Sequence, residues 1–398
     1  MSTTSLKFRV LQIDAAKNSD YQVDTYDVQT QDGYVLLLFR VRRRVENHCI
    51  QKRTDPNSSN AENCLNEKRA VFLMHGFMSD SNSFVYGGIS EGLAFILANA
   101  GYDVFLGNAR GNIYGQRHTT LNPQRDAAFW RFCWEEIGTK DLPALLNKAL
   151  SVSGMSSISY IGHNEGTTAF YVMGSENPEF LEKIDRQISL GPIAFMKNAN
   201  DEVLDNIVSH FTQKSWIMKN VGSSSISATD ELTQTAKSNC LSDKYDEEIC
   251  KNSYFLINGY NSKNLNMTTF KELRSHLPSS AAVREILHFA ELKKKCSWVL
   301  TVLTQATVCR FSKYSETGEA EDYDLSKLTV PIALFYTPND PLSNTDDVNT
   351  LASKLPNVYQ QYQFKELTNN LDLMWSENMN NVNTKILQAL EAIPNKLV

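Results

Sequence analysis

Short hydrophobic runs alternate with amphipathic stretches along most of the chain. The runs rich in Val, Ile, Leu, Phe and Tyr predict β-strands at 34–41, 71–74, 102–106, 158–161, 188–190, 332–336 and 360–364. Apolar residues recurring at helical spacing predict helices at 91–100, 141–150, 168–173, 348–355 and 382–392. Strands that alternate with helices in this way predict an α/β fold with a mostly parallel central sheet and helices on both faces.

The alternation fades in one long stretch. Between residues 191 and 310, helical segments and polar connections replace the strand–helix pattern. We therefore expect a core formed by residues 1–190 and 311–398, and a helical cap or lid formed by residues 191–310 and inserted over the sheet.

Composition narrows the class of protein. Of the 398 residues, 42% are hydrophobic and 21% are charged, which is typical of a folded globular chain. The net charge of -6 provides no general attraction for nucleic acid. No apolar run reaches the roughly eighteen residues that a transmembrane helix needs. Met1 to Asp20 lacks the apolar region of a signal peptide.

Cysteines and glycosylation motifs nevertheless favour a secretory route. Six of the seven cysteines fall into close pairs along the chain, and we expect disulfides Cys49–Cys64, Cys240–Cys250 and Cys296–Cys309, with Cys133 left free and buried beside Trp134. Two sequons place glycosylation acceptors at Asn57 and Asn266. Together these features favour a secreted or luminal protein, in conflict with the missing signal peptide.

The chemistry-bearing motif follows the strand at 158–161. A strand, a tight turn of the form Gly-x-nucleophile-x-Gly and a helix together make a nucleophile elbow, in which the middle residue projects above the sheet. Gly162 and Gly166 provide this frame, and Asn164 stands at its centre.

From about Tyr26 to Leu390 the chain resembles the family of lysosomal acid, gastric and insect acid lipases. The matching stretches are His75-Gly76-Phe77, Gly107 to Asn112, Phe129-Trp130, Asp141 to Ala144, Gly166-Thr167-Thr168 and Asn261 to Thr268. The resemblance implies an α/β-hydrolase fold, no cofactor, no metal, and a fatty acid or neutral lipid as the ligand. It also supports the Cys240–Cys250 pair, because the family often has a cysteine pair in its insertion.

The resemblance places the catalytic triad on three residues of this chain. The family's serine corresponds to Asn164, its acid to Asp340, which is retained, and its histidine to Asn370. An amide is a poor nucleophile, and it has no pKa near neutrality with which to relay a proton. Conversion of Asn164 to Asp by deamidation would still leave the site without a base, and an engineered change explains one altered position better than two.

The backbone N–H groups that would stabilise an oxyanion correspond to Phe77 and Glu165. Because the family usually has Gln at the second position, Glu165 adds a carboxylate where negative charge would develop. We therefore expect the chain not to be an enzyme, but a lipase-like pseudoenzyme that binds lipid or serves as a yolk-type storage protein. The alternative is a residual or altered ester hydrolase.

Overall fold

The computed structural model describes most of the expected core and part of the expected insertion. The described residues are 20–44, 68–199, 225–226, 264, 266, 277, 279–294, 297–300, 305–308, 310–315, 320–367, 369–377 and 379–392. The expected disulfides and Asn57 lie outside these residues, as does most of the stretch from 191 to 310, so they stay predictions.

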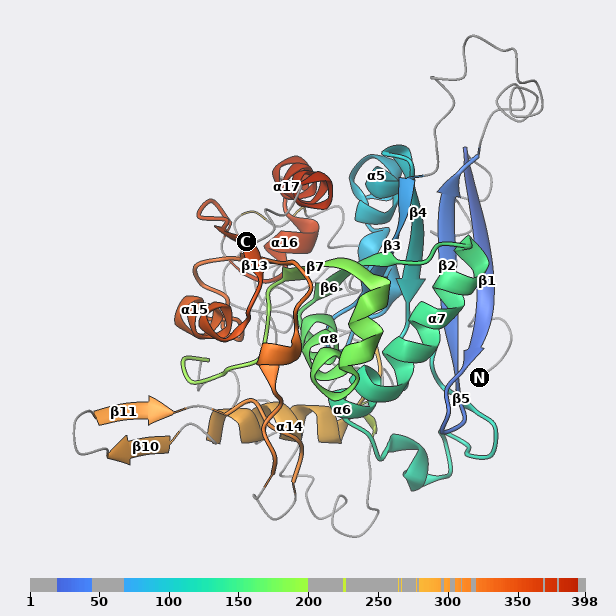
Figure 1. Ribbon diagram of the computed structural model, residues 1–398. Helices are drawn as coiled ribbons and strands as arrows, with labels where there is room; N and C mark the ends of the chain where they lie inside the picture. The colour runs from blue at the N-terminus through green and yellow to red at the C-terminus, as the bar shows by residue number, and fades with distance from the viewer. Residues whose placement is uncertain are drawn as a thin grey trace, which may run out of the picture.

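A nine-stranded sheet forms the centre of the molecule, in the order β1-β2-β4-β3-β6-β7-β12-β13, with β5 paired to β2 (Figure 1). Its strands are β1 (Tyr21–Gln29), β2 (Tyr34–Arg43), β3 (Lys68–Met74), β4 (Tyr102–Gly107), β5 (Arg117–His118), β6 (Ile158–His163), β7 (Ile184–Leu190), β12 (Ile332–Tyr336) and β13 (Val358–Gln363). From β4 to β13 all neighbours are parallel, whereas β1, β2 and β5 pair antiparallel. The predicted α/β class is thus confirmed.

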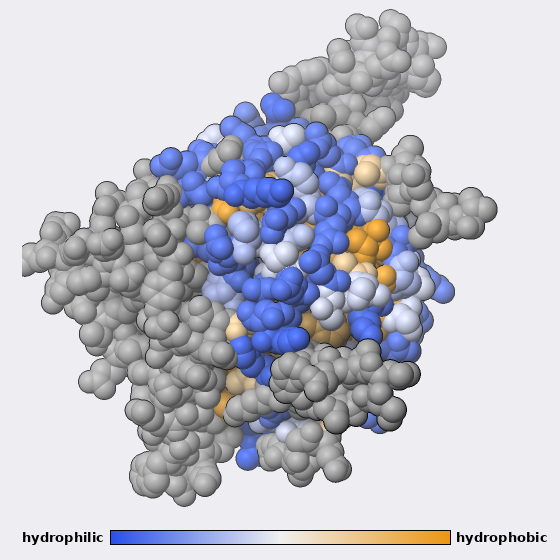
Figure 2. Space-filling model, turned by 90° about the vertical axis from the view of Figure 1, so that its left-hand side faces the viewer, coloured by the Kyte–Doolittle hydropathy of each residue, from blue (hydrophilic) through white to orange (hydrophobic). Residues whose placement is uncertain are grey.

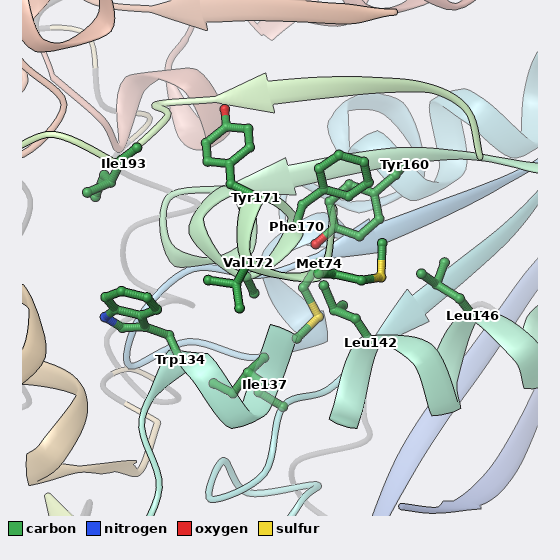
Figure 3. Packing of buried hydrophobic residues seen from close by; sticks show 14 of the residues in the cluster. Met74, Trp134, Ile137, Leu142, Leu146, Tyr160, Phe170, Tyr171, Val172 and Ile193 are labelled. Atoms are coloured by element: carbon green, nitrogen blue, oxygen red, sulfur yellow. The ribbon is translucent and has the colours of Figure 1, made fainter. Parts of the chain in front are cut away.

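Helices cover both faces of this sheet, because each has an apolar side to bury. On one face, α7 (Leu142–Ser153), α8 (Glu165–Glu176) and α15 (Thr345–Lys354) enclose one core. Figure 3 shows part of it, including Leu142, Tyr160 and Val172. On the other face, α5 (Leu93–Asn99), α16 (Asp372–Trp375) and α17 (Met379–Glu391) pack over a second core that includes Leu73, Ile161 and Phe335. Shorter helical segments are α4 (Gly88–Glu91), α6 (Trp134–Glu136) and η4 (Ile137–Asp141).

Part of the stretch expected to be an insertion is among the described residues. It includes β9 (Ala281–Ala282), which pairs with β8 (Ser225–Ile226), helix α14 (Val283–Lys294), and the hairpin of β10 (Ser297–Leu300) and β11 (Gln305–Val308). Phe289 and Leu292 of α14 join the core on the α8 face. The boundaries of a separate cap remain a prediction.

The element predictions were good where strands are buried on both faces. All seven predicted strands occur, and Gly101, expected at the end of a helix, has the positive φ of 88° that this position favours. Strand β1 was missed. Its sequence YQVDTYDVQ is largely polar, and only residues near its two ends are buried, so it lacks the apolar pattern of a strand. It forms a strand because it pairs with β2 along its whole length.

The described surface gives little sign of a broad apolar patch. The face in Figure 2 is mostly hydrophilic, with small hydrophobic areas. Ile89, with 46% of its surface exposed, is the exposed large hydrophobic residue among the described positions. Within the same part of the chain, no helix has the length and apolar character needed to cross a membrane.

Candidate functional site

The turn between β6 and α8 has the geometry of a nucleophile elbow. Asn164 has φ 51° and ψ −117°, a conformation rarely adopted by a residue other than glycine. The backbone holds it there: Asn164 N donates to Leu190 O at 2.9 Å, and Thr167 N donates to Asn164 O at 2.9 Å. Strain of this kind at the end of a parallel strand is typical of a functional position.

The two glycines of the motif allow helix and strands to approach closely. A Cβ on Gly162 would lie 2.8 Å from the carbonyl carbon of Gly166, and a Cβ on Gly166 would lie 2.5 Å from Met74 O. Neither separation can accommodate a side chain, so both glycines are required for the elbow to form beside β3. This is the role that the motif predicted.

The Asn164 amide is buried and half paired. Its Oδ1 accepts a hydrogen bond from the N–H of Glu165 at 2.8 Å, and its Nδ2 has no hydrogen-bond partner among the described residues. The amide oxygen therefore occupies the backbone donor expected to stabilise an oxyanion, while the amide nitrogen offers a different donor to whatever binds above the elbow. Buried polar groups without partners are uncommon, and they often mark a place for a ligand or water.

Asp340 and Asn370 form a buried pair next to the elbow. Asn370 Nδ2 donates to Asp340 Oδ2 at 2.7 Å, while Asp340 Oδ1 accepts from the N–H groups of Leu342 and Ser343, each at 2.9 Å. Burial raises the pKa of Asp340, and these hydrogen bonds oppose that rise. The structure thus brings together the two positions that the resemblance assigned to the acid and the base. Gly191, the residue after β7, leaves room for this pair, because a Cβ there would overlap Asn370 Nδ2.

His163 lies beside the same group of residues. A Cβ on Gly76 would be 2.8 Å from Asn164 Cβ and 3.1 Å from His163 Nδ1, so both side chains flank the Gly76–Phe77 loop. Burial lowers the pKa of His163 to about 4, and the neighbouring Asn370 opposes that shift. Neither ring nitrogen has a hydrogen bond of ordinary geometry to a described residue.

By contrast, His75 is part of the framework. Its Nε2 accepts from the N–H of Ala109 at 3.1 Å and lies 3.0 Å from Asn112 Nδ2. Its Nδ1 lies 2.9 Å from Gly76 O. With both ring nitrogens engaged, His75 braces the loop that leads into Phe77.

A second buried carboxyl group faces Glu165. Glu165 begins α8, and Glu285 lies in the first turn of α14; they are only 4% and 2% exposed. Burial raises the pKa of Glu165 to about 8, with the neighbouring Glu285 opposing the rise. Burial and the adjacent carboxyl of Glu165 raise the pKa of Glu285 well above its ordinary value. Sequence reasoning identified Glu165 but not Glu285, because no motif connects two residues so far apart in the chain.

The strand order and the elbow define an α/β-hydrolase. A carboxylesterase, CesB from Bacillus subtilis, has a similar fold, with a TM-score of 0.51 at 11% identity, covering 98% of this chain and 100% of that structure. A thermophilic esterase from Thermogutta terrifontis has a TM-score of 0.50 at 13% identity, covering 92% and 98% of the two chains. At these identities the likeness shows the fold alone.

The family is shown by closer relatives. Lipase 1 of Drosophila melanogaster is 30% identical over 386 residues, covering 94% of this chain and 78% of that protein. Gastric triacylglycerol lipase of Mus musculus is 29% identical, covering 89% and 85%, and human lysosomal acid lipase/cholesteryl ester hydrolase is 28% identical, covering 88% and 83%. Residues 13–88 match the family model described as a partial alpha/beta-hydrolase lipase region. The chain belongs to the acid lipase family of α/β-hydrolases.

These relatives correct one expectation. From Asn164 and Asn370 we expected the chain not to be an enzyme, but the proteins that it matches along most of its length are named lipases and a cholesteryl ester hydrolase. The comparisons therefore point to a hydrolase. The expectation judged the site by the residue types of one mechanism, and it took no account of the polar groups that the fold gathers around the elbow.

Proposed function

We propose that this protein hydrolyses esters of fatty acids by an altered route that does not pass through an acyl-enzyme. The observation that carries the proposal is a set of buried polar atoms on three consecutive elbow residues that have no hydrogen bond of ordinary geometry to a described residue: the ring nitrogens of His163, which lie beside Asn370, Nδ2 of Asn164 and Oε1 of Glu165. An ester carbonyl and a water molecule are polar groups of the kind that such atoms bind.

The substrate class follows from the surroundings of the elbow and from the relatives. Met78, Val283 and Ile286 form a small apolar cluster with Phe77, which directly follows Gly76. An apolar wall beside a few polar groups is typical of a site for a lipid ester. The names of the relatives specify triacylglycerol and cholesteryl esters as substrates of those proteins. A fatty-acid ester, or the free fatty acid as product, is therefore the proposed ligand.

In the proposed reaction water replaces the serine. The ester carbonyl oxygen accepts hydrogen bonds from Asn164 Nδ2 and the N–H of Phe77, which stabilise the oxyanion that develops. Water attacks the carbonyl carbon, and its proton passes to the neutral imidazole of His163. The bond to the alcohol oxygen then breaks, and that oxygen takes the proton from His163, which releases a carboxylic acid and an alcohol. Asp340 holds Asn370 beside His163.

This route has a defined pH dependence and a low rate. A base is most effective when its pKa is near the working pH, and burial lowers the pKa of His163 to about 4. Hydrolysis should therefore rise between about pH 3 and 5 as His163 loses its proton. Above that range it should level off at a low rate, because so weak a base removes a proton from water poorly.

The test is hydrolysis of p-nitrophenyl butyrate from pH 3 to 7, with and without a fluorophosphonate that reacts with catalytic serines. We expect slow turnover that the fluorophosphonate does not block, with an inflection near pH 4. Replacing Asn164→Leu should lower the rate at least tenfold, because the amide donor is lost. The same change at the exposed Asn380 of α17, Asn380→Leu, is the matched control and should have no effect.

Two outcomes would overturn the proposal. Turnover that the fluorophosphonate abolishes would assign the activity to a serine, either in this chain or in a contaminant. Saturable binding of a fluorescent fatty acid with no turnover of any ester would make the region beside the elbow a lipid-binding site.

We further propose that the protein is a secreted or luminal glycoprotein. The gastric and lysosomal names of its relatives, the paired cysteines and the two sequons support this location. Asn266, one of the sequon residues, is half-buried, with its N–H donating to Trp375 O at 2.9 Å and its Nδ2 to Glu91 Oε2 at 3.3 Å. Peptide mapping without reduction should find the three expected disulfides, and seven free thiols would contradict the proposed location.

A further inference from the structure

Helix α14 and the strand before it contact both backbone segments that border the proposed site. Ser279 N donates to Met78 O at 2.8 Å, and the rings of Phe77 and Phe289 meet edge to face with their centroids 6.2 Å apart. These contacts hold the loop that contains Phe77. A further contact, between the side chains of Glu285 and Glu165, joins the first turn of α14 to the elbow itself.

The contact between Glu285 and Glu165 is unusual because it brings together two carboxyl groups. Glu285 is fixed by the strand before its helix, since its Oε2 accepts from the N–H of Ala282 in β9. Oε1 of Glu165 has no hydrogen-bond partner among the described residues. The other ionisable side chain that acts on the pair is Asp141, a further acid, which is itself engaged by Arg110. No cation in the described part of the chain forms an ion pair with either glutamate.

Two carboxyl groups that face each other in the interior cannot both carry a charge, so the pair must retain at least one proton, and burial favours the neutral form of each. The pKa of Glu165 is raised to about 8 and that of Glu285 well above its ordinary value. A carboxyl group that is in contact with water has its ordinary pKa, so undocking would lower both pKa values. The docked arrangement thus binds more protons than an undocked one. Its stability is complete below about pH 4.5 and is lost as the pH rises through about 8.

We propose that Glu165 and Glu285 form a proton-dependent latch that holds the first turn of α14 against the elbow, so that acid keeps the site assembled and alkali releases it. This inference rests on the proposed function for its biological meaning, because the latch controls the site where esters would be cleaved. The two glutamates are positioning residues, since they act through the backbone of the elbow and through α14.

The structure contains a reporter for this latch. One turn beyond Glu285, His288 stacks on the indole of Trp134, with ring centroids 3.6 Å apart and planes 10° from parallel. His288 is otherwise held by Ser312 O at 3.0 Å from its Nε2 and by Cys133 Sγ at 3.3 Å from its Nδ1. Displacement of the first turn of α14 would disturb this stack and expose Trp134, which is 0% exposed in the docked state.

The experiment is tryptophan fluorescence of the whole protein from pH 4.5 to 9.5, without substrate. We expect a reversible red shift on the alkaline side, with a steepness of about two protons, since both carboxyls ionise on release. Glu165→Gln should reduce the steepness to about one proton, and Glu165→Gln with Glu285→Gln should remove the transition. Trp134→Phe should remove the signal, which assigns it to that stack.

A matched control and the contrary outcomes complete the test. Glu179→Gln makes the same change at an exposed residue just after α8, and it should leave the transition unaltered. A transition that persists unchanged in the double variant, or the absence of any transition in the wild type, would overturn the latch. Because fluorescence requires no turnover, a failure of ester hydrolysis with an intact transition would refute the proposed function and leave the latch standing.

Discussion

Two buried clusters of ionisable side chains lie close together in this protein, and they are built in opposite ways. Arg110 is buried between two acids. Its Nε and Nη2 donate to Asp141 Oδ1 at 2.9 and 2.6 Å. Its Nη1 lies 2.7 Å from Asp32 Oδ2. Its guanidinium also stacks over Tyr34 at 4.0 Å. The Glu165–Glu285 pair, by contrast, has no cation.

The difference separates a framework from a responsive site. A buried charge with paired hydrogen bonds on each side keeps one protonation state over a wide pH range, and it fixes the segments that it joins. A buried pair of like groups is held only while protons remain on it. The first cluster joins the segments that contain Asp32, Arg110 and Asp141, and the second joins the elbow to α14.

The largest effect is expected from restoring a serine mechanism at the elbow. Asn370 already donates to Asp340 at 2.7 Å, the position from which an imidazole Nδ1–H would donate. Asn164→Ser with Asn370→His should therefore raise p-nitrophenyl butyrate hydrolysis by roughly 10²–10⁴-fold and make it sensitive to fluorophosphonate. Asn164→Ser alone should not, and equal gains from the single change would reveal another base.

The next effect tests the paired cluster. Arg110→Leu leaves Asp141 buried without its cation, and we expect a loss of about 3–5 kcal/mol in the free energy of unfolding, measured with urea at pH 7. A loss below about 1 kcal/mol would mean that Asp141 is stable without the guanidinium, and the contrast between the two clusters would then be wrong.

The unpaired cluster should respond with the opposite sign. At pH 8, Glu165→Gln with Glu285→Gln should increase the free energy of unfolding by about 2 kcal/mol. The pKa values of both carboxyls are raised in the folded protein, so at this pH the unfolded chain releases protons that the folded protein retains, which favours unfolding. The two amides do not titrate, so the double variant avoids this loss. Near pH 4.5 the two proteins should have equal stability. Urea titrations at both pH values measure this, and a gain that is the same at both would indicate packing rather than protonation.

The smallest effect sets the baseline for charge pairs on the surface. Arg117 and Asp27 form an ion pair with 48% and 59% of their side chains exposed. Arg117→Ala should change the free energy of unfolding by no more than about 0.5 kcal/mol, because water and salt screen the pair. A loss comparable to that of Arg110→Leu would show that exposure does not distinguish the clusters.

The sequence predicted the sheet and the elbow because both depend on local patterns. Buried strands such as β6 are continuous apolar runs, and Gly162 and Gly166 are fixed by close backbone approach. It could not predict β1, which depends on pairing with β2. Nor could it predict that Asn164 Oδ1 accepts from the N–H of Glu165, or that Glu285 faces Glu165, since those contacts depend on side-chain rotamers and on long-range packing.

The parallel pairing of β7 with β12 has a consequence for how the chain acquires its structure. It sets residue 187 beside residue 332, across the whole stretch expected to be the insertion. Contacts between such distant residues form late, because the entropy of closing a long loop opposes them. Until β12 arrives, the edge of β7 is open to pairing with other chains. Asp340 and Asn370 follow β12 in sequence, so the elbow folds before its acid arrives, and during synthesis this edge is where we expect misassembly to begin.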